Sequence, residues 1–197
     1  MVSPQPGSER GQWYLAEMCV QIIVLNGGSS AGKTTIARSL QGMLTPPWLL
    51  FGVDDVVEAI PQQGIKDGSL LSFGPNGRVD VGPRWRDVER SWFEGIRAVA
   101  ESGTGVIIDE VLLDGGQGQK RLQGMLGDLT VLWVGVTCDA EVAEAREALR
   151  GDRVPGMARS QATHVHTNMV YDVVIDTSDQ TSGACAEIIY AQLSSDT

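Results

Sequence analysis

The feature that most constrains the fold is a glycine-rich segment, residues 27–35, which reads GGSSAGKTT and directly follows the apolar run CVQIIVLN. It satisfies the spacing G-x-x-x-x-G-K-[ST] between an expected strand at residues 19–26 and an expected helix that opens at Lys33 and ends before Pro46. Glycines allow successive backbone N–H groups to turn inward around phosphate oxygens, and the N-terminus of a helix adds partial positive charge. The segment therefore predicts a phosphate-binding loop (P-loop) that joins a strand to a helix.

The side chains of this loop predict how a nucleotide is bound. We expect Lys33 to reach the β- and γ-phosphates of ATP, and the Thr34 hydroxyl to take a ligand position of Mg²⁺. The apolar run GVIIDEV carries Asp109 near its end, where P-loop proteins commonly place a carboxylate on Mg²⁺. Glu110 alternates to the other face of this expected strand, so Asp109 is the predicted metal ligand and Glu110 the less favoured substitute. The expected ATP-binding residues are Gly27, Gly28, Ser29, Ser30, Ala31, Gly32, Lys33, Thr34 and Thr35.

Strand-like and helix-like segments alternate along the rest of the chain, which predicts βαβ units and a mostly parallel sheet. Residues 69–81 have the pattern of a β-hairpin. Residues 83–102 carry the apolar stripe of a core-facing helix, in which Trp85 and Trp92 are also candidates for a pocket wall. Besides residues 19–26, the expected strands lie at residues 48–54, 105–111, 130–139 and 170–178.

Composition restricts the classes of partner. Fifteen Lys and Arg against twenty-five Asp and Glu give a net charge of −10, which argues against nucleic acid or an anionic membrane surface as the main partner. Three widely spaced cysteines without a C-x-x-C pair predict neither a zinc site nor a disulfide framework, and they favour a reducing, cytoplasmic location. No apolar run has the length of a membrane span. Residues 1–17 are expected to form a flexible extension and residues 18–197 a single domain.

Asp54 is the main candidate for chemistry on the acceptor side. It ends the apolar run WLLFGVD, so it should lie at the carboxyl edge of the sheet, where ligands bind in open α/β folds. Phosphoryl transfer to an alcohol needs a group that accepts the hydroxyl proton, and an Asp can do so. The alternative interpretation is an N-cap for the short helix DVVEAI. The neighbouring Asp55 is better suited to capping than to chemistry.

Arginines are concentrated in the segment AREALRGDRVPGMARSQ of this otherwise acidic chain. They are Arg146, Arg150, Arg153 and Arg159. Glycines and a proline interrupt the helical pattern, so we expect a loop with helical flanks that can close over ATP as a lid. Arg150 and Arg153 are the expected contacts to the transferring phosphate. The alternative is a solvated loop in which Asp152 pairs with an arginine.

Together these motifs resemble the chloramphenicol phosphotransferase family. The resemblance spans residues 21–177 and rests on IVLNGGSSAGKTT, PWLLFGVD, VGP, IIDEV, LWVGVTCDAEVAEARE, RGDRVPGMA and YDVVIDT. It implies a three-layer α/β P-loop NTPase fold like that of nucleoside-monophosphate kinases, with helices on both faces of a five-stranded parallel sheet and an Arg-rich lid. The strand order to expect is 48–54, 105–111, 19–26, 130–139 and 170–178.

The same resemblance implies the reaction. ATP and Mg²⁺ would phosphorylate a hydroxyl of chloramphenicol or a similar antibiotic, a small-molecule alcohol. By the family pattern Asp54 is the base, and Arg150 and Arg153 lie with the phosphates. Residues 62–80, QQGIKDGSLLSFGPNGRVD, depart from that pattern where an acceptor pocket would be lined. The acceptor therefore stays open between chloramphenicol, another antibiotic and another natural-product alcohol.

Two alternatives remain from the sequence. One is a kinase of a nucleotide, a nucleotide sugar or another metabolite, although a nucleotide acceptor should need basic residues, and residues 55–82 offer only Lys66 and Arg78. The other is a nucleotide-operated switch without acceptor chemistry, although the chain has no guanine-reading N-K-x-D. The choice between ATP and GTP and the oligomeric state, including a homo-oligomer, stay open.

Overall fold

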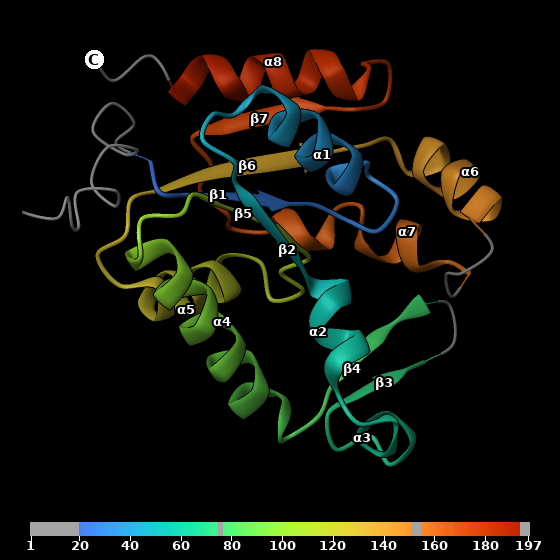
Figure 1. Ribbon diagram of the computed structural model, residues 1–197. Helices are drawn as coiled ribbons and strands as arrows, with labels where there is room; N and C mark the ends of the chain where they lie inside the picture. Colours follow the sequence, from blue (N-terminus) through green and yellow to red (C-terminus); the bar gives the residue numbers. More distant parts are fainter. Residues whose placement is uncertain (1–19, 75–76, 151–154, 194–197) are drawn as a thin grey trace, which may run out of the picture.

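A five-stranded parallel sheet forms the centre of the computed structural model, which describes residues 20–74, 77–150 and 155–193 (Figure 1). The strands are β1 (Ile22–Asn26), β2 (Leu49–Gly52), β5 (Val106–Glu110), β6 (Val131–Thr137) and β7 (Val173–Asp176). Their order across the sheet is β2-β5-β1-β6-β7, and every neighbouring pair is parallel. The predicted strand order is confirmed.

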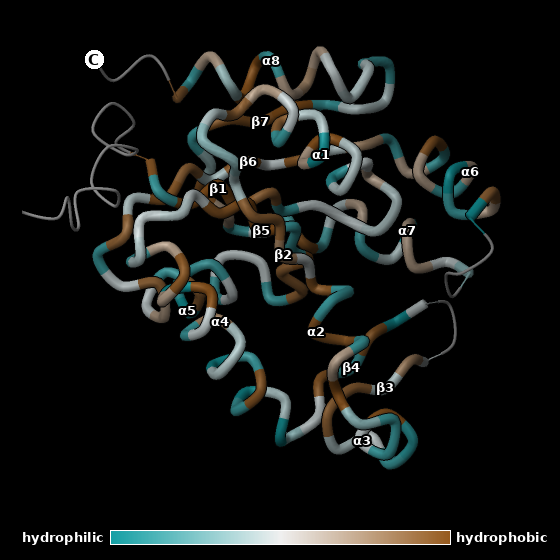
Figure 2. Tube along the Cα trace, in the orientation of Figure 1, coloured by the Kyte–Doolittle hydropathy of each residue, from teal (hydrophilic) through white to brown (hydrophobic). Residues whose placement is uncertain are grey.

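Helices cover both faces of this sheet. The helices α1 (Lys33–Met43) and α8 (Ser182–Leu193) lie on one face, and α4 (Trp85–Glu101) and α5 (Gly116–Leu126) lie on the other (Figure 1). Successive side chains of a strand point to opposite faces, so β1 supplies both cores: Ile23 and Leu25 pack under α1 and α8. Ile22 and Val24 pack under α4 and α5. Hydrophobic residues are concentrated along these strands (Figure 2), and the predicted three-layer α/β fold is confirmed.

A smaller group of elements extends from the carboxyl end of β2. It contains α2 (Val53–Ala59), α3 (Gln62–Lys66) and an antiparallel hairpin of β3 (Leu71–Phe73) and β4 (Val79–Val81). Their apolar side chains form a third cluster, which Trp85 joins from the start of α4. The predicted hairpin is confirmed, and α3 is an element that the sequence patterns did not indicate.

The boundary between β2 and α2 differs from the prediction. The strand expected at residues 48–54 ends at Gly52, and Asp54 lies in the first turn of α2. The reason is local: the Asp55 carboxylate accepts a hydrogen bond of 2.7 Å from the Gly52 N–H, which satisfies a donor at the helix start. Asp55 therefore caps the helix, as expected, and Asp54 lies beside this cap at the edge of the sheet.

The arginine-containing segment has helical flanks, as predicted. Helix α6 (Ala140–Arg150) continues to Arg150, and a second short helix, α7 (Met157–Gln161), follows. Asp139 caps the start of α6, since its carboxylate accepts a hydrogen bond from the Glu141 N–H. Residues 1–17, the expected extension, lie outside the described part of the chain. Among the described helices, none combines the length and the apolar character needed to cross a membrane.

Candidate active site

The P-loop follows β1 directly and has the conformation of an anion cradle. Ser30 and Gly32 adopt φ angles of 60° and 89°, in the left-handed region, and these turn the backbone back toward the start of α1. The hydroxyl groups of Ser29 and Ser30 are buried, and neither has a hydrogen-bond partner among the described residues. Buried polar groups normally are hydrogen-bonded, so these unpaired hydroxyls fit the oxygens of a bound phosphate.

The first residue of the loop plays a different part. The Gly27 N–H donates a hydrogen bond of 3.4 Å to the Glu110 carbonyl and so continues the sheet. A Cβ at Gly27 would lie 2.3 Å from the Val136 carbonyl oxygen, so only glycine fits between β5 and β6 here. Gly27 therefore packs against the sheet, whereas Ser29 and residues 32–35 line a cavity.

Lys33, Thr34 and Asp109 come together at the mouth of the P-loop. The Lys33 ammonium donates to the Gly28 carbonyl at 2.9 Å and lies 3.6 Å from one Asp109 carboxylate oxygen. The Thr34 hydroxyl donates to the other Asp109 oxygen at 2.5 Å. The strand register produces this meeting, because Asp109 stands beside Leu25 on β1 and Gly52 on β2. A hydroxyl and a carboxylate side by side are oxygen ligands of the kind that Mg²⁺ prefers.

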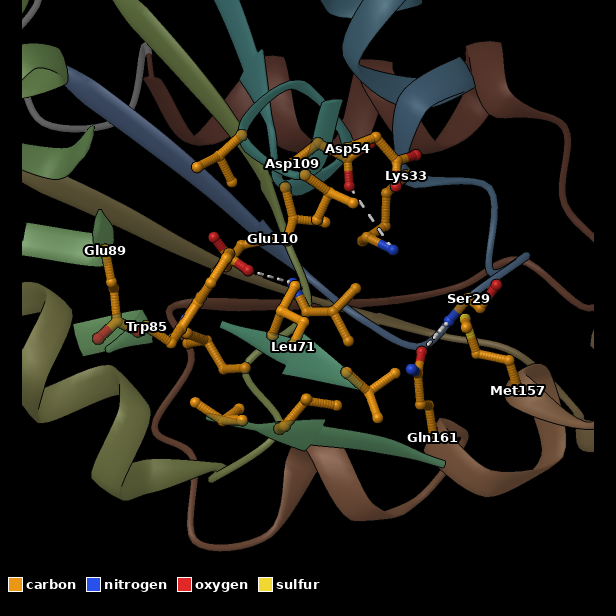
Figure 3. Close-up of a pocket in the computed structure, with 18 of the residues that line it drawn as sticks. Ser29, Lys33, Asp54, Leu71, Trp85, Glu89, Asp109, Glu110, Met157 and Gln161 are labelled. Carbon is orange, nitrogen blue, oxygen red and sulfur yellow. Dashed lines mark hydrogen bonds and ion pairs between the residues drawn. The ribbon is translucent and has the colours of Figure 1, made fainter. Parts of the chain in front are cut away.

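These groups open onto a cavity of about 200 Å³ whose lining also includes Asp54 and Arg150. Figure 3 shows Asp54, Lys33 and Asp109 gathered at one side of the cavity and Leu71 and Trp85 at another. The parallel sheet explains the gathering, since the P-loop, Asp54 and Asp109 all follow carboxyl ends of neighbouring strands.

The side of the cavity away from the P-loop is mainly apolar. Its lining comes from α2, from the β3–β4 hairpin and from α4. Trp92 packs edge-on against Phe51 with ring centroids 6.0 Å apart, and Trp85 belongs to the third core cluster. Both tryptophans therefore contribute to the core and to the pocket wall. The apolar lining residues are Val53, Val56, Val57, Leu71, Phe73, Val79, Val81, Trp85, Trp92 and Phe93.

A network of four charged side chains forms a polar edge of the same cavity. Arg86 donates to Glu89 at 2.8 Å and to Asp114 at 2.7 Å. Arg121 contacts the same two carboxylates, at 3.3 Å and 2.9 Å. The charges alternate and balance, so this edge is polar without a net charge. The sequence does not reveal this network, because only Arg86 and Glu89 have the helical spacing of an ion pair.

Glu110 also lines the cavity, next to Asp109, although the sequence pattern did not place it there. It is buried, and one of its oxygens accepts a hydrogen bond of 2.8 Å from the Val111 N–H. Burial raises the pKa of Glu110 to about 7, and the nearby Asp109 carboxylate adds to this. The alternation of side chains along a strand predicted that Glu110 points away from the site. However, β5 ends at Glu110, and the cavity is lined by residues on both sides of this strand end.

The arginines of the lid segment have different positions. Arg150 lines the cavity, whereas Arg146 donates to the Thr177 carbonyl at 2.7 Å. Arg159 forms an exposed ion pair with Glu144. Arg153, the second predicted phosphate contact, lies outside the described residues. Of the three described arginines in this segment, Arg150 lines the cavity, and Arg146 and Arg159 form contacts outside it.

Comparison with known proteins places the chain in a family. Residues 20–194 match the model of chloramphenicol phosphotransferase-like proteins. The chain belongs to this family. Two curated relatives from strains of Mycobacterium tuberculosis, both provisionally named O-phosphotransferases, are 32% identical over 170 residues, which are 80% of this chain and 75% of each relative. The predicted enzyme class, a phosphotransferase, is confirmed.

Solved structures agree on the fold of this family member. A sugar kinase from Janibacter sp. HTCC2649 superposes with a TM-score of 0.64 at 20% identity, and the match covers 87% of this chain and 93% of the kinase. The APS kinase CysC of Mycobacterium tuberculosis, solved with AMPPNP and APS, gives a TM-score of 0.60 at 14% identity over 89% of this chain and 98% of that one. The fold is thus that of P-loop kinases.

Proposed function

We propose that the protein transfers the γ-phosphate of ATP to a hydroxyl group of a small antibiotic such as chloramphenicol. The observation that carries this proposal is the composition of one cavity. Lys33 and the Thr34–Asp109 pair lie at its phosphate-binding side, Asp54 stands beside them, and the far wall is aromatic and aliphatic. This composition suits a donor site and an acceptor site within one cavity.

The donor phosphates would lie along the P-loop. Lys33 would exchange its present contact with the Gly28 carbonyl for phosphate oxygens, and the Ser29 and Ser30 hydroxyls would gain the partners that the described residues do not supply. A second hollow, lined by Gly32, Thr35, Ile36, Arg146, Thr177, Gln180 and Ser182, adjoins the loop and has room for the nucleoside. Arg146 is held there by Thr177 and Cys138.

Thr34 and Asp109 would hold the Mg²⁺ that accompanies ATP, and this ion supplies neutralisation of charge on the phosphate oxygens when it is bound. Among the described residues there is no cluster of three or more His, Cys, Asp or Glu suited to a metal. This agrees with Mg²⁺, which usually takes only one or two protein ligands and completes its shell with water and phosphate.

Asp54 would accept the proton of the acceptor hydroxyl. As the hydroxyl oxygen bonds to the γ-phosphorus, its proton passes to the Asp54 carboxylate and the bond to the ADP oxygen breaks, which releases ADP. Arg150 would stabilise the negative charge on the transferring group, since it lines the same cavity. By its place in the sequence Arg153 is proposed to do the same.

The charge of the cavity favours an acceptor without phosphate groups. The positively charged lining residues among those described are Lys33, Arg86, Arg121 and Arg150. Arg86 and Arg121 are already neutralised by Glu89 and Asp114. Lys33 and Arg150 face the donor phosphates. An acceptor with an aromatic or aliphatic body and a hydroxyl group fits this lining better than a nucleotide does.

Mass spectrometry tests the acceptor directly. Purified protein is incubated with Mg-ATP and a panel of antibiotics that includes chloramphenicol, and the products are examined for a single added phosphate. Phosphorylated chloramphenicol is the expected result. A different phosphorylated compound would keep the mechanism and replace the substrate, and nucleotide binding without acceptor-dependent ADP release would favour a switch protein.

A pair of neighbouring variants tests the role of Asp54. Asp54→Asn should lower turnover by about 10²–10⁴-fold, because the amide cannot take the hydroxyl proton, while ATP binding is retained. Asp55→Asn is the matched control: its amide oxygen can still accept the hydrogen bond from the Gly52 N–H, so the cap is kept and turnover should stay near normal. Turnover of Asp54→Asn within a few-fold of the parent would remove Asp54 from the mechanism.

A further inference from the structure

The P-loop makes a hydrogen bond to the lid segment that sequence patterns do not indicate. The Ser29 N–H donates to the side-chain oxygen Oε1 of Gln161 at 2.8 Å, across 132 positions of sequence. Both residues are buried, with 7% and 5% of their surface exposed. Both also line the cavity, and Figure 3 shows the Gln161 amide turned toward Ser29. The bond therefore connects the phosphate-binding loop to the last residue of α7.

This bond fixes the orientation of the Gln161 amide. A backbone N–H can only donate, so the oxygen of the amide must face Ser29 and the nitrogen Nε2 must face away from it. No hydrogen-bond acceptor among the described residues engages Nε2. Gln161 lines the cavity together with Ser29 and Lys33. The two N–H groups of its Nε2 therefore lie beside the P-loop.

The position of Gln161 is held from two sides. The Glu147 carboxylate on α6 accepts hydrogen bonds of 2.8 Å from the N–H groups of Gly156 and Ala158, and so anchors the first turn of α7. Gly28 in the P-loop lies against the other end, since a Cβ there would be 3.3 Å from the Gln161 Cβ and backbone carbon. Helix α7 is thus packed onto the P-loop, and the Gln161 side chain has a defined place.

We propose that Gln161 contacts the γ-phosphate of the bound nucleoside triphosphate through Nε2, with Ser29 holding the amide in the required orientation. The inference rests on the proposed function only in that it takes ATP as the phosphate donor. Ser29 is the third residue of GGSSAGKTT, ahead of the glycine and lysine that start α1, and its side of the loop adjoins the cavity shared with Asp54 and Arg150. A neutral donor there recognises the terminal phosphate, and Gln161 consequently distinguishes ATP from ADP.

Two substitutions separate this role from a structural one. Gln161→Glu keeps an oxygen that accepts from the Ser29 N–H but removes the N–H donors of Nε2. Gln161→Leu removes the acceptor oxygen and the N–H donors and adds no charge. Isothermal titration calorimetry with Mg²⁺ measures the affinity of each protein for AMPPNP and for ADP. We expect the preference for AMPPNP over ADP to fall by about 10–100-fold in both variants, because a hydrogen bond to a charged group is lost.

The outcomes are distinguishable. Gln161→Glu should unfold at nearly the temperature of the parent, since the contact with Ser29 is kept, so a loss of preference in this variant does not come from misfolding. Its added charge could itself repel phosphate, and the neutral Gln161→Leu excludes that explanation if it shows the same loss. An unchanged preference in Gln161→Leu, or equal losses for AMPPNP and ADP, would overturn the inference and assign Gln161 a structural role. A parent protein that binds neither nucleotide would overturn the proposed function as well.

Discussion

Replacing Glu110 by glutamine should remove a pH-dependent loss of stability from the nucleotide-free protein. Burial raises the pKa of Glu110 from its ordinary value of 4.5 to about 7. The folded protein therefore binds a proton at Glu110 that the unfolded chain releases near pH 4.5. A glutamine side chain at this position carries no such proton, and its amide oxygen could still accept the hydrogen bond from the Val111 N–H.

The direction and size of the effect follow from proton linkage. Below pH 4.5 the carboxyl group is neutral in both states and costs no stability. As the pH rises from 4.5 to about 7 the unfolded chain binds fewer protons than the folded protein, so stability falls, and above pH 7 the loss is complete. The two pKa values, 4.5 in the unfolded chain and about 7 in the folded protein, differ by an interval that at about 1.36 kcal/mol per pH unit corresponds to about 3 kcal/mol of unfolding free energy. For a chain of this length that is roughly 6–12 °C in Tm.

The assay is urea or thermal unfolding between pH 5 and 8.5 without Mg²⁺ or nucleotide. The parent protein should lose stability relative to Glu110→Gln over this range, and above pH 7 the variant should be the more stable protein. Glu94→Gln is the matched control, because Glu94 lies exposed on α4 and undergoes the same chemical change. If the stabilities of the parent and Glu110→Gln change with pH in parallel, Glu110 ionises normally in the folded protein and its pKa is not raised.

Two further predictions concern Asp109, the proposed metal ligand, and Glu147, which anchors α7. Asp109→Asn keeps an oxygen for the Thr34 hydroxyl but removes the carboxylate, so the Mg²⁺ concentration for half-maximal nucleotide-dependent turnover should rise by about 10–100-fold; an unchanged Mg²⁺ titration would remove Asp109 from the metal site. Glu147→Ala removes the acceptor of two backbone N–H groups of α7 and should cost about 1–3 kcal/mol by urea unfolding. Glu144→Ala removes only an exposed ion pair with Arg159, so it should destabilise the protein much less than Glu147→Ala does, and equal losses of stability would contradict the anchoring role.

The sequence predicted those parts of the site whose chemistry depends on neighbours in the chain. The P-loop spacing places Lys33 and Thr34 at the start of a helix whatever packs around it, and an apolar strand that ends in a carboxylate places Asp109 at the sheet edge. The strand order came from the family resemblance and is the one found. The boundary of β2 was wrong by two residues, because the capping of α2 by Asp55 competes with the strand pattern at Gly52.

The tertiary structure alone decided which distant groups meet and which become buried. Gln161 reaches Ser29 only because α7 packs on the P-loop, and Arg121 balances Glu89 only because α4 and α5 share one face of the sheet. Glu110 acquires its raised pKa from burial, which depends on everything that surrounds the end of β5. Local spacing fixes the backbone conformation of the P-loop and therefore the positions of Lys33 and Thr34 at the start of α1. The environment of a side chain is set by segments that folding brings together. Local spacing was therefore enough to predict the P-loop, whereas the lining of the cavity and the contact that we assign to the γ-phosphate depend on the fold.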